Sequence, residues 1–276
     1  MEEEEIKKVV REGYAKVAKK GRSCCEPEEK SCCGSEVDEE TVSKAIGYTK
    51  EELDSLPEGA DLGLGCGNPV ALASIKEGDT VVDLGSGAGI DCFLAAKKVG
   101  ENGKVIGVDM TPEMIDKARE NAEKGDFDNV EFRLGEIEHL PVADNTADLI
   151  ISNCVINLAP DKSKVFGEAF RVLKPGGSLM VSDIVLLKPL PDYLKTADMY
   201  TGCVAGAMLR DEYIQTIKDA GFEKIDIIDE VGMRAEVVTG DPDSQKILKD
   251  QKITLEEAAD AVGSIVSIKV YAVKPN

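Results

Sequence analysis

The sequence contains a single histidine, His139, no tryptophan, and aromatic residues at only 4% of its 276 positions. One histidine excludes general-base chemistry by a histidine pair and a metal site built from several histidines. Positive charge is also scarce, because 33 Lys and Arg face 53 Asp and Glu, for a formal net charge of −20. Nucleic acids and anionic lipids attract clustered positive charge, so we expect neither as a partner.

Long apolar runs are missing as well. No segment approaches the roughly 20 apolar residues of a membrane-spanning helix, and the acidic start MEEEEIKK does not resemble a secretory signal. We therefore expect a cytoplasmic protein without membrane contact, acting as a monomer. Thiols stay reduced in the cytosol, so the eight cysteines need an explanation other than permanent disulfides.

Composition and periodicity divide the chain into three predicted regions: 1–75, 76–188 and 189–276. The first combines a helical pattern over 6–20, a Cys-rich loop over 21–38 and a short helix with Thr49 as its N-cap. In the second, strand and helix patterns alternate. Strands are predicted at Thr80–Leu84, Lys104–Asp109, Val130–Leu134, Ala147–Ser152 and Ser178–Val185, and helices at Ile90–Val99, Pro112–Lys124 and Lys162–Leu173. This alternation favours a doubly wound α/β sheet of parallel strands.

The third region, 189–276, is predicted to be a small α+β region. Helices are expected over 210–220 and over 255–262, where Thr254 is the N-cap. Strands are expected over 224–229 and 265–273. The last strand belongs either to the same sheet or to a small sheet of its own.

A glycine-rich turn joins the first strand to its helix, in the sequence DLGSGAG at 83–89. Glycines let the backbone turn sharply and approach a ligand, and the helix that follows presents unsatisfied N–H groups. Asp83 stands before the glycines, where it would repel a pyrophosphate but accept a cationic amino acid. Asp109 ends the next strand, where a carboxylate can bind both ribose hydroxyls. Asp109 alone would fit NAD equally well, and the alternative for Asp83 is a strand-end cap.

These segments resemble the class I S-adenosylmethionine-dependent methyltransferases. The resemblance is carried by DLGSGAG at 83–89, VDMTPEMI at 108–115, LPVADNTADLIISN at 140–153 and RVLKPGG at 171–177. It implies a Rossmann-like sheet with S-adenosylmethionine at the carboxyl ends of its strands. It also implies four groups of residues around that cofactor. Asp83, Gly85, Ser86 and Gly87 would line the methionine part, and Asp109 and Met110 would hold the ribose and adenine. Glu136 and Ile137 would flank the base, and Asn153 would lie beside the reacting methyl.

Three cysteines from distant segments can meet at the same edge of the sheet. Cys154 directly follows the fourth strand, Cys203 lies in the segment after the fifth, and Cys66 lies in a glycine-rich segment before the first. Three thiolates without histidine suit a soft trigonal centre, and their spacing does not match a zinc ribbon. The alternative is that cytosolic cysteines are small buried apolar residues, which fits Cys92 on the buried face of its helix best.

A narrower resemblance rests on GADLGLGCGNP at 59–69, DLGSGAGIDCFLAA at 83–96, ISNCVINL at 151–158 and GCVAGA at 202–207. These strings closely resemble arsenite S-adenosylmethionine methyltransferases. The resemblance implies that Cys66, Cys154 and Cys203 bind As(III), delivered as arsenite or a thiol conjugate. It also implies a redox partner for Cys66 among the N-terminal pairs, here Cys32 or Cys33. We expect thioredoxin or glutathione to reduce the resulting disulfide. The alternative for the Cys24-Cys25 and Cys32-Cys33 pairs is that they are inert residues of the N-terminal loop.

Two other functions compete with this one. A methyltransferase acting on another small metabolite would need a general base near Asn153, for which Asp183 and Asp198 are the nearby acids. A non-catalytic thiol protein that sequesters metalloids would bind As(III) without depending on the methyl donor. The glycine-rich turn and Asp109 argue against this second alternative, because sequestration needs no cofactor site.

Overall fold

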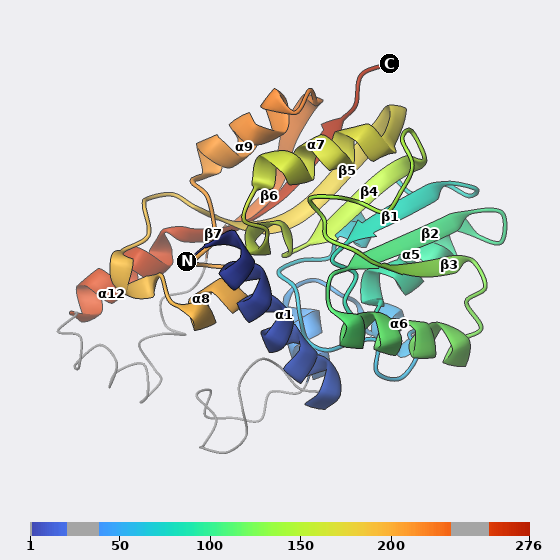
Figure 1. The fold of residues 1–276 in the computed structure, drawn as a ribbon, viewed down its shortest axis with the longest axis horizontal. Helices are drawn as coiled ribbons and strands as arrows, with labels where there is room; N and C mark the ends of the chain where they lie inside the picture. The colour runs from blue at the N-terminus through green and yellow to red at the C-terminus, as the bar shows by residue number, and fades with distance from the viewer. Residues whose placement is uncertain (1, 21–38, 233–253) are drawn as a thin grey trace.

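The computed structural model describes residues 2–20, 39–232 and 254–276 (Figure 1). Its centre is a seven-stranded sheet with the strand order β3-β2-β1-β4-β5-β7-β6. The strands are β1 (Thr80–Leu84), β2 (Lys104–Asp109), β3 (Val130–Leu134), β4 (Ala147–Asn153), β5 (Leu173–Leu186), β6 (Glu223–Gly232) and β7 (Ile265–Val273). Pairing is parallel from β3 to β5, and β7 runs antiparallel to both of its neighbours. This is the predicted doubly wound sheet, with an antiparallel strand added.

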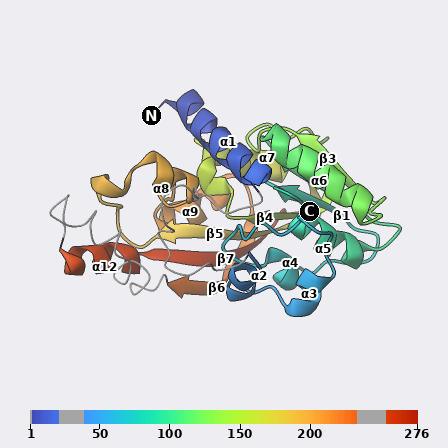
Figure 2. The same ribbon diagram turned by 90° about the horizontal axis from the view of Figure 1, so that it is seen from below.

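Helices cover both faces of the sheet. They are α1 (Glu3–Lys20), α2 (Glu39–Ala45), α3 (Lys50–Asp54), α4 (Pro69–Leu72), α5 (Ile90–Val99), α6 (Pro112–Lys124), α7 (Lys162–Val172), α8 (Ala197–Thr201), α9 (Arg210–Asp219) and α12 (Leu255–Gly263), with 3-10 turns η1 (Ile156–Leu158) and η2 (Asp192–Leu194). In Figure 2, α1 lies on one side of the sheet and α3 and α4 lie on the other. None of the helices in the described part of the chain has the length and apolarity needed to cross a membrane.

Alternating side chains of the strands supply two separate cores. In β1, Val82 and Leu84 pack with Phe166 of α7 and Tyr213 of α9 on one face. Val81 points the other way, into the cluster that holds Cys92, Phe93 and other residues of α5. This alternation follows from the two-residue period of a strand. Burial on both faces explains why the strand sequences are nearly continuous apolar runs.

The predicted elements are present with small changes at their ends. The capping boxes of Thr49 and Thr254 form, and β7 joins the main sheet rather than a sheet of its own. Strand β5 begins at Leu173, ahead of the predicted Ser178, because Leu173 already pairs with Ala147. The predicted loop over 21–38 lies outside the described residues.

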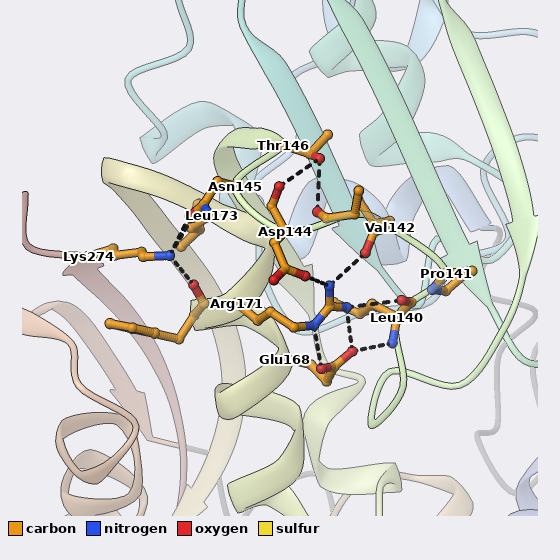
Figure 3. Close-up of polar contacts among 12 residues, drawn as sticks. Leu140, Pro141, Val142, Asp144, Asn145, Thr146, Glu168, Arg171, Leu173 and Lys274 are labelled. Carbon is orange, nitrogen blue, oxygen red and sulfur yellow. Dashed lines mark hydrogen bonds and ion pairs between the residues drawn. The ribbon is translucent and has the colours of Figure 1, made fainter.

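Arg171 of α7 fixes the segment between β3 and β4 (Figure 3). Its guanidinium donates hydrogen bonds to the carbonyl oxygens of Leu140 at 3.2 Å and Val142 at 2.9 Å. It also pairs with the carboxylates of Asp144 and Glu168. Two of the motifs found in the sequence, at 140–153 and 171–177, therefore meet here and hold the chain that leads from the end of β3 to the start of β4.

Candidate active site

The carboxyl ends of β1, β2 and β4 open into a cavity of about 620 Å³. Helix α1, which packs beside α6 and α8 (Figure 1), contributes Lys7, Val10 and Tyr14 to its wall. Carboxylates outnumber cations in the lining: Asp61, Asp83, Asp91, Asp109 and Glu138 are present with Lys7 and Lys269. This excess of negative charge favours a cationic ligand.

The glycine-rich turn after β1 forms one wall of the cavity. Gly85 and Gly87 have φ angles of +71° and +51°, in the left-handed region that favours glycine. A Cβ on Gly85 would lie 2.3 Å from Val155, whereas no atom of the described residues comes within 4 Å of one on Gly87. Ser86 lines the cavity, and its hydroxyl is buried with no hydrogen-bond partner among residues 2–20, 39–232 and 254–276. A buried hydroxyl in this state calls for a partner, which a ligand in the cavity can supply.

Two acids lie next to each other behind this turn. Asp83 lies one residue before the end of β1, Asp91 lies in the first turn of α5, and both are almost fully buried. Burial, followed by the neighbouring charge of Asp91, raises the pKa of Asp83 well above its usual range. Burial raises the pKa of Asp91 to about 6. The thiol of Cys92 donates to Asp83 at 3.2 Å, which agrees with a structural role for this cysteine. A positively charged ligand beside the two carboxyls would favour their ionised forms.

Asp109 is held rigidly at the end of β2. Its carboxylate accepts the backbone N–H of Gly87 at 3.0 Å and that of Thr111 at 2.8 Å. Burial nevertheless raises the pKa of Asp109. Met110 lines the cavity beside it. Asp109 therefore faces the cavity with a fixed orientation, as a group that binds ribose hydroxyls must.

The segment after β3 differs from the sequence expectation at one position. Ile137 lines the cavity, but Glu136 does not. The carboxylate of Glu136 instead pairs with Lys7 of α1 at 2.6 Å, and Glu138, 3.2 Å from the same ammonium group, lines the cavity. The sequence contained no signal for this contact, because Lys7 is far from Glu136 along the chain.

The three predicted cysteines come together in the same cavity. Cys66, Cys154 and Cys203 all line it. The sulfur atoms of Cys66 and Cys154 and a carboxylate oxygen of Asp183 lie within 4.8 Å of one another. Hydrogen bonding to the thiols of Cys203 and Cys66, then burial, raises the pKa of Cys154 well above its usual value. Cys154 thus stands between the other two thiols. The predicted redox residues Cys24, Cys25, Cys32 and Cys33 lie outside the described residues.

Two of these cysteines have an unusual backbone conformation. Cys154 and Cys203 have φ angles of +59° and +64°, which non-glycine residues rarely adopt. Their positions are fixed by neighbours: the N–H of Cys154 donates to the carbonyl of Ser182 at 2.7 Å, and the thiol of Cys203 donates to the carbonyl of Cys154 at 2.8 Å. Local strain of this kind concentrates at functional sites.

Cys66 is held by a loop that needs its two flanking glycines. A Cβ on Gly65 would lie 2.8 Å from the side chain of Asn153, and one on Gly67 would lie 2.0 Å from the hydroxyl of Ser182. The N–H of Cys66 donates to the amide oxygen of Asn153 at 3.0 Å. The sequence placed Asn153 beside the reacting methyl, and the structure shows its amide bound to the Cys66 loop.

Asp183 is a site residue that the sequence nominated only for a different reaction. It is fully buried in β5 and accepts hydrogen bonds from Tyr213 at 3.1 Å, Asn157 at 3.0 Å and the N–H of Ile184 at 2.9 Å. Burial raises its pKa to about 7. An acid within the apolar run of β5 was the available signal. The side chain of Asp198, the other nominated acid, is outside the described part of the molecule.

Known proteins that are similar to this chain include methyltransferases. Residues 75–221 match a family model described as a methyltransferase domain. An arsenite methyltransferase of Halobacterium salinarum is 53% identical over 81% of this chain and 59% of its own length. The human arsenite methyltransferase is 38% identical over 63% of this chain and 49% of its own length. This chain therefore spans about half to three fifths of these relatives.

A crystal structure is similar as well. That of an arsenic(III) S-adenosylmethionine methyltransferase from Chlamydomonas reinhardtii matches with a TM-score of 0.62 and 31% identity. The match covers 84% of this chain and 73% of that one. The similarity therefore extends over most of this chain.

Proposed function

This chain belongs to the S-adenosylmethionine-dependent methyltransferases, and we propose that it methylates trivalent arsenic, supplied as arsenite or as a thiol conjugate of arsenite. One observation carries the proposal: three thiols from separate segments line one cavity with Asp83, Asp109 and the glycine-rich turn. Arsenite methyltransferase is also the name of the similar proteins. The cytoplasmic location, the monomeric state and the three-region division of the chain stay predictions.

The residues of the cavity fit S-adenosylmethionine. Asp109 would bind the ribose, and Met110 and Ile137 would contact the adenine. The unpartnered hydroxyl of Ser86 and the open space at Gly87 suit the methionine part, whose ammonium group the buried acids Asp83 and Asp91 would balance. When bound, this cofactor supplies a methyl group on a positively charged sulfur. Neither cation among the described lining residues competes at Asp83, because Lys7 is paired with Glu136 and Glu138 and Lys269 is paired with Asp229.

The thiols carry the other half of the reaction. As thiolates, Cys66, Cys154 and Cys203 would replace the oxygens of arsenite and hold As(III) in a trigonal arrangement. The arsenic lone pair would stay free to attack the methyl carbon, and the methyl–sulfur bond would break as neutral S-adenosylhomocysteine leaves. No base then has to remove a proton from the attacking atom. Catalysis by the protein then consists mainly of positioning, which contributes about 7–11 kcal/mol at the favourable limit.

The reaction also needs a reductant. Methylation takes arsenic formally from As(III) to As(V), and two thiolates return it to As(III) by giving up two electrons and forming a disulfide. We place Cys66 in that disulfide, with Cys32 or Cys33 as its partner. Cys66 is half-buried, whereas Cys154 and Cys203 are buried, so Cys66 is the most accessible of the three to a second thiol. Thioredoxin or glutathione would then reduce the disulfide by exchange.

The direct test uses the purified protein, arsenite, methyl-labelled S-adenosylmethionine and a thiol reductant. We expect methylated arsenic species on chromatography, and their loss to background in Cys154→Ser and Cys203→Ser. Cys92→Ser is the matched control, because it removes a buried thiol but keeps a donor for Asp83. Methylation of arsenic that survives either of the first two substitutions contradicts the three-thiolate site.

A further inference from the structure

One amide side chain connects the two ends of the cavity. Asn153, at the end of β4, accepts the N–H of Cys66 at 3.0 Å. Its nitrogen is surrounded by three acceptors: the carbonyl of Gly67 at 2.7 Å, the phenol of Tyr48 at 2.9 Å and a carboxylate oxygen of Asp91 at 3.1 Å. Asn153 thus binds the backbone on both sides of the Cys66 side chain.

The remaining members of this cluster lie toward the methionine end. Tyr48 is 2% exposed and donates to the other carboxylate oxygen of Asp91 at 2.8 Å. Asp91 is 3% exposed, lines the cavity and stands beside Asp83. Both oxygens of the Asp91 carboxylate are therefore engaged, one by the phenol and one by the amide that fixes the Cys66 loop.

We propose that Tyr48, Asp91 and Asn153 form a positioning cluster that sets the place of Cys66 and couples binding of the methyl donor to binding of As(III). The proposal rests on the proposed function. A positively charged ligand group bound beside Asp91 favours the ionised form of that carboxyl, and hydrogen bonds to an ionised carboxylate are the stronger ones. Tighter bonds to Asn153 hold the Cys66 loop in the position from which its sulfur reaches arsenic. The coupling is reciprocal, because each ligand must change the affinity of the other by the same factor.

The cluster has an asymmetric effect on the two ligands. Cys66 is bound to it through the backbone, so loosening the cluster moves a ligand of arsenic directly. The nucleoside end depends on Asp109 and the glycine-rich turn, neither of which contacts Tyr48 in these hydrogen bonds. Damage to Tyr48 should therefore weaken As(III) binding while leaving the nucleoside affinity nearly intact.

The test variant is Tyr48→Phe, which removes the phenol oxygen and keeps the buried ring. Tyr271→Phe is the matched control, because this tyrosine packs against the same apolar cluster but is not bonded to Asn153. As(III) binding is measured by equilibrium dialysis with and without S-adenosylhomocysteine, which has the same amino acid group and allows no turnover. S-adenosylhomocysteine binding is measured by calorimetry with and without As(III).

The wild type and Tyr271→Phe should bind As(III) more tightly when S-adenosylhomocysteine is present, by a factor in the range of about 5–150. In Tyr48→Phe we expect As(III) affinity to fall about tenfold, as for one lost hydrogen bond, and the coupling factor to shrink. The KM for arsenite should rise, whereas the affinity for S-adenosylhomocysteine measured without As(III) should stay the same. Asn153→Asp, which removes the amide donor, should behave in the same way and replaces Tyr48→Phe if that variant does not fold.

The outcomes separate this inference from the function on which it rests. If the wild type binds no As(III), both are overturned. If the wild type binds and methylates As(III) while Tyr48→Phe and Asn153→Asp keep its affinity and its coupling factor, only the positioning cluster is wrong. Equal As(III) affinity of the wild type with and without S-adenosylhomocysteine rejects the coupling.

Discussion

Near the thiols of the cavity, two residues have an unusual backbone conformation and a third is a buried acid. Cys154 and Cys203 have positive φ angles, and the carboxyl of Asp183 is fully buried within reach of the thiols of Cys66 and Cys154. A stable interior would avoid both features, since each lowers stability. Their presence at one place is what a reactive site requires, and it makes the stability of the protein depend on pH.

Asp183→Asn should change that pH dependence. Burial raises the pKa of Asp183 from its ordinary 3.8 to about 7, so the folded state binds an extra proton between these values. The wild type therefore loses stability as pH rises from about 4 to about 7. The asparagine variant can still accept from Asn157 and Ile184 with its one oxygen and can donate to the phenol of Tyr213, and it has no proton to lose. Chemical denaturation at several pH values should show that the free energy of unfolding of the variant rises relative to that of the wild type as pH increases across this window. If the difference in the free energy of unfolding between the two proteins stays constant from pH 4 to 7, the pKa of the buried Asp183 carboxyl is not raised.

Gly65→Ala tests the packing of the Cys66 loop. The new Cβ would meet Asn153 at 2.8 Å, and the φ angle of +106° is unfavourable for alanine. We expect a loss of about 1–3 kcal/mol in the free energy of unfolding, as for overpacked sites, together with weaker As(III) binding. Gly167→Ala is the control, because this glycine lies on the exposed face of α7 with open space around it. That change should stabilise the helix by about 0.5–1 kcal/mol.

Secondary-structure elements differ in how well the sequence predicts them. The strands and helices of residues 76–188 follow from local signals: apolar runs, alternating strand and helix patterns, and the glycine-rich turn. The place of β7 between β5 and β6 depends on long-range pairing, which no local pattern encodes. The same holds for Lys7 against Glu136 and for the clamp of Asn153 on the Cys66 loop. Most of the sequence-predicted residues that line the cavity lie at or just after strand ends, where topology alone brings them together.

Arg171 is the residue whose substitution should test the β3–β4 segment as an element. The planar guanidinium reaches two carbonyl oxygens and two carboxylates, a set that a lysine ammonium cannot match. Arg171→Lys should lower the free energy of unfolding by about 1–3 kcal/mol. Arg210→Lys, on an exposed pair with Glu230, should leave it nearly unchanged, because exposed ion pairs contribute little. Thermal unfolding of both variants measures the difference. Equal losses of stability in the two variants would contradict the role of Arg171 in holding the segment between β3 and β4.

The whole molecule gathers its site from segments that are far apart in the sequence. Cys66 comes from the chain before the sheet, Cys154 from the end of β4 and Cys203 from the segment after α8, while α1 closes the wall beside the nucleoside residues. The excess of carboxylates in the lining suits a cationic methyl donor, and the thiols suit a soft acceptor. The account therefore depends on all three sulfurs reaching one atom.

X-ray absorption spectroscopy of the protein loaded with one equivalent of As(III) tests that claim most directly. The account predicts that arsenic has three sulfur neighbours and no oxygen neighbour in the wild type, and that one sulfur is replaced in Cys154→Ser or Cys203→Ser. Arsenic bound by two sulfurs or fewer in the wild type, or an unchanged spectrum in both variants, would contradict it.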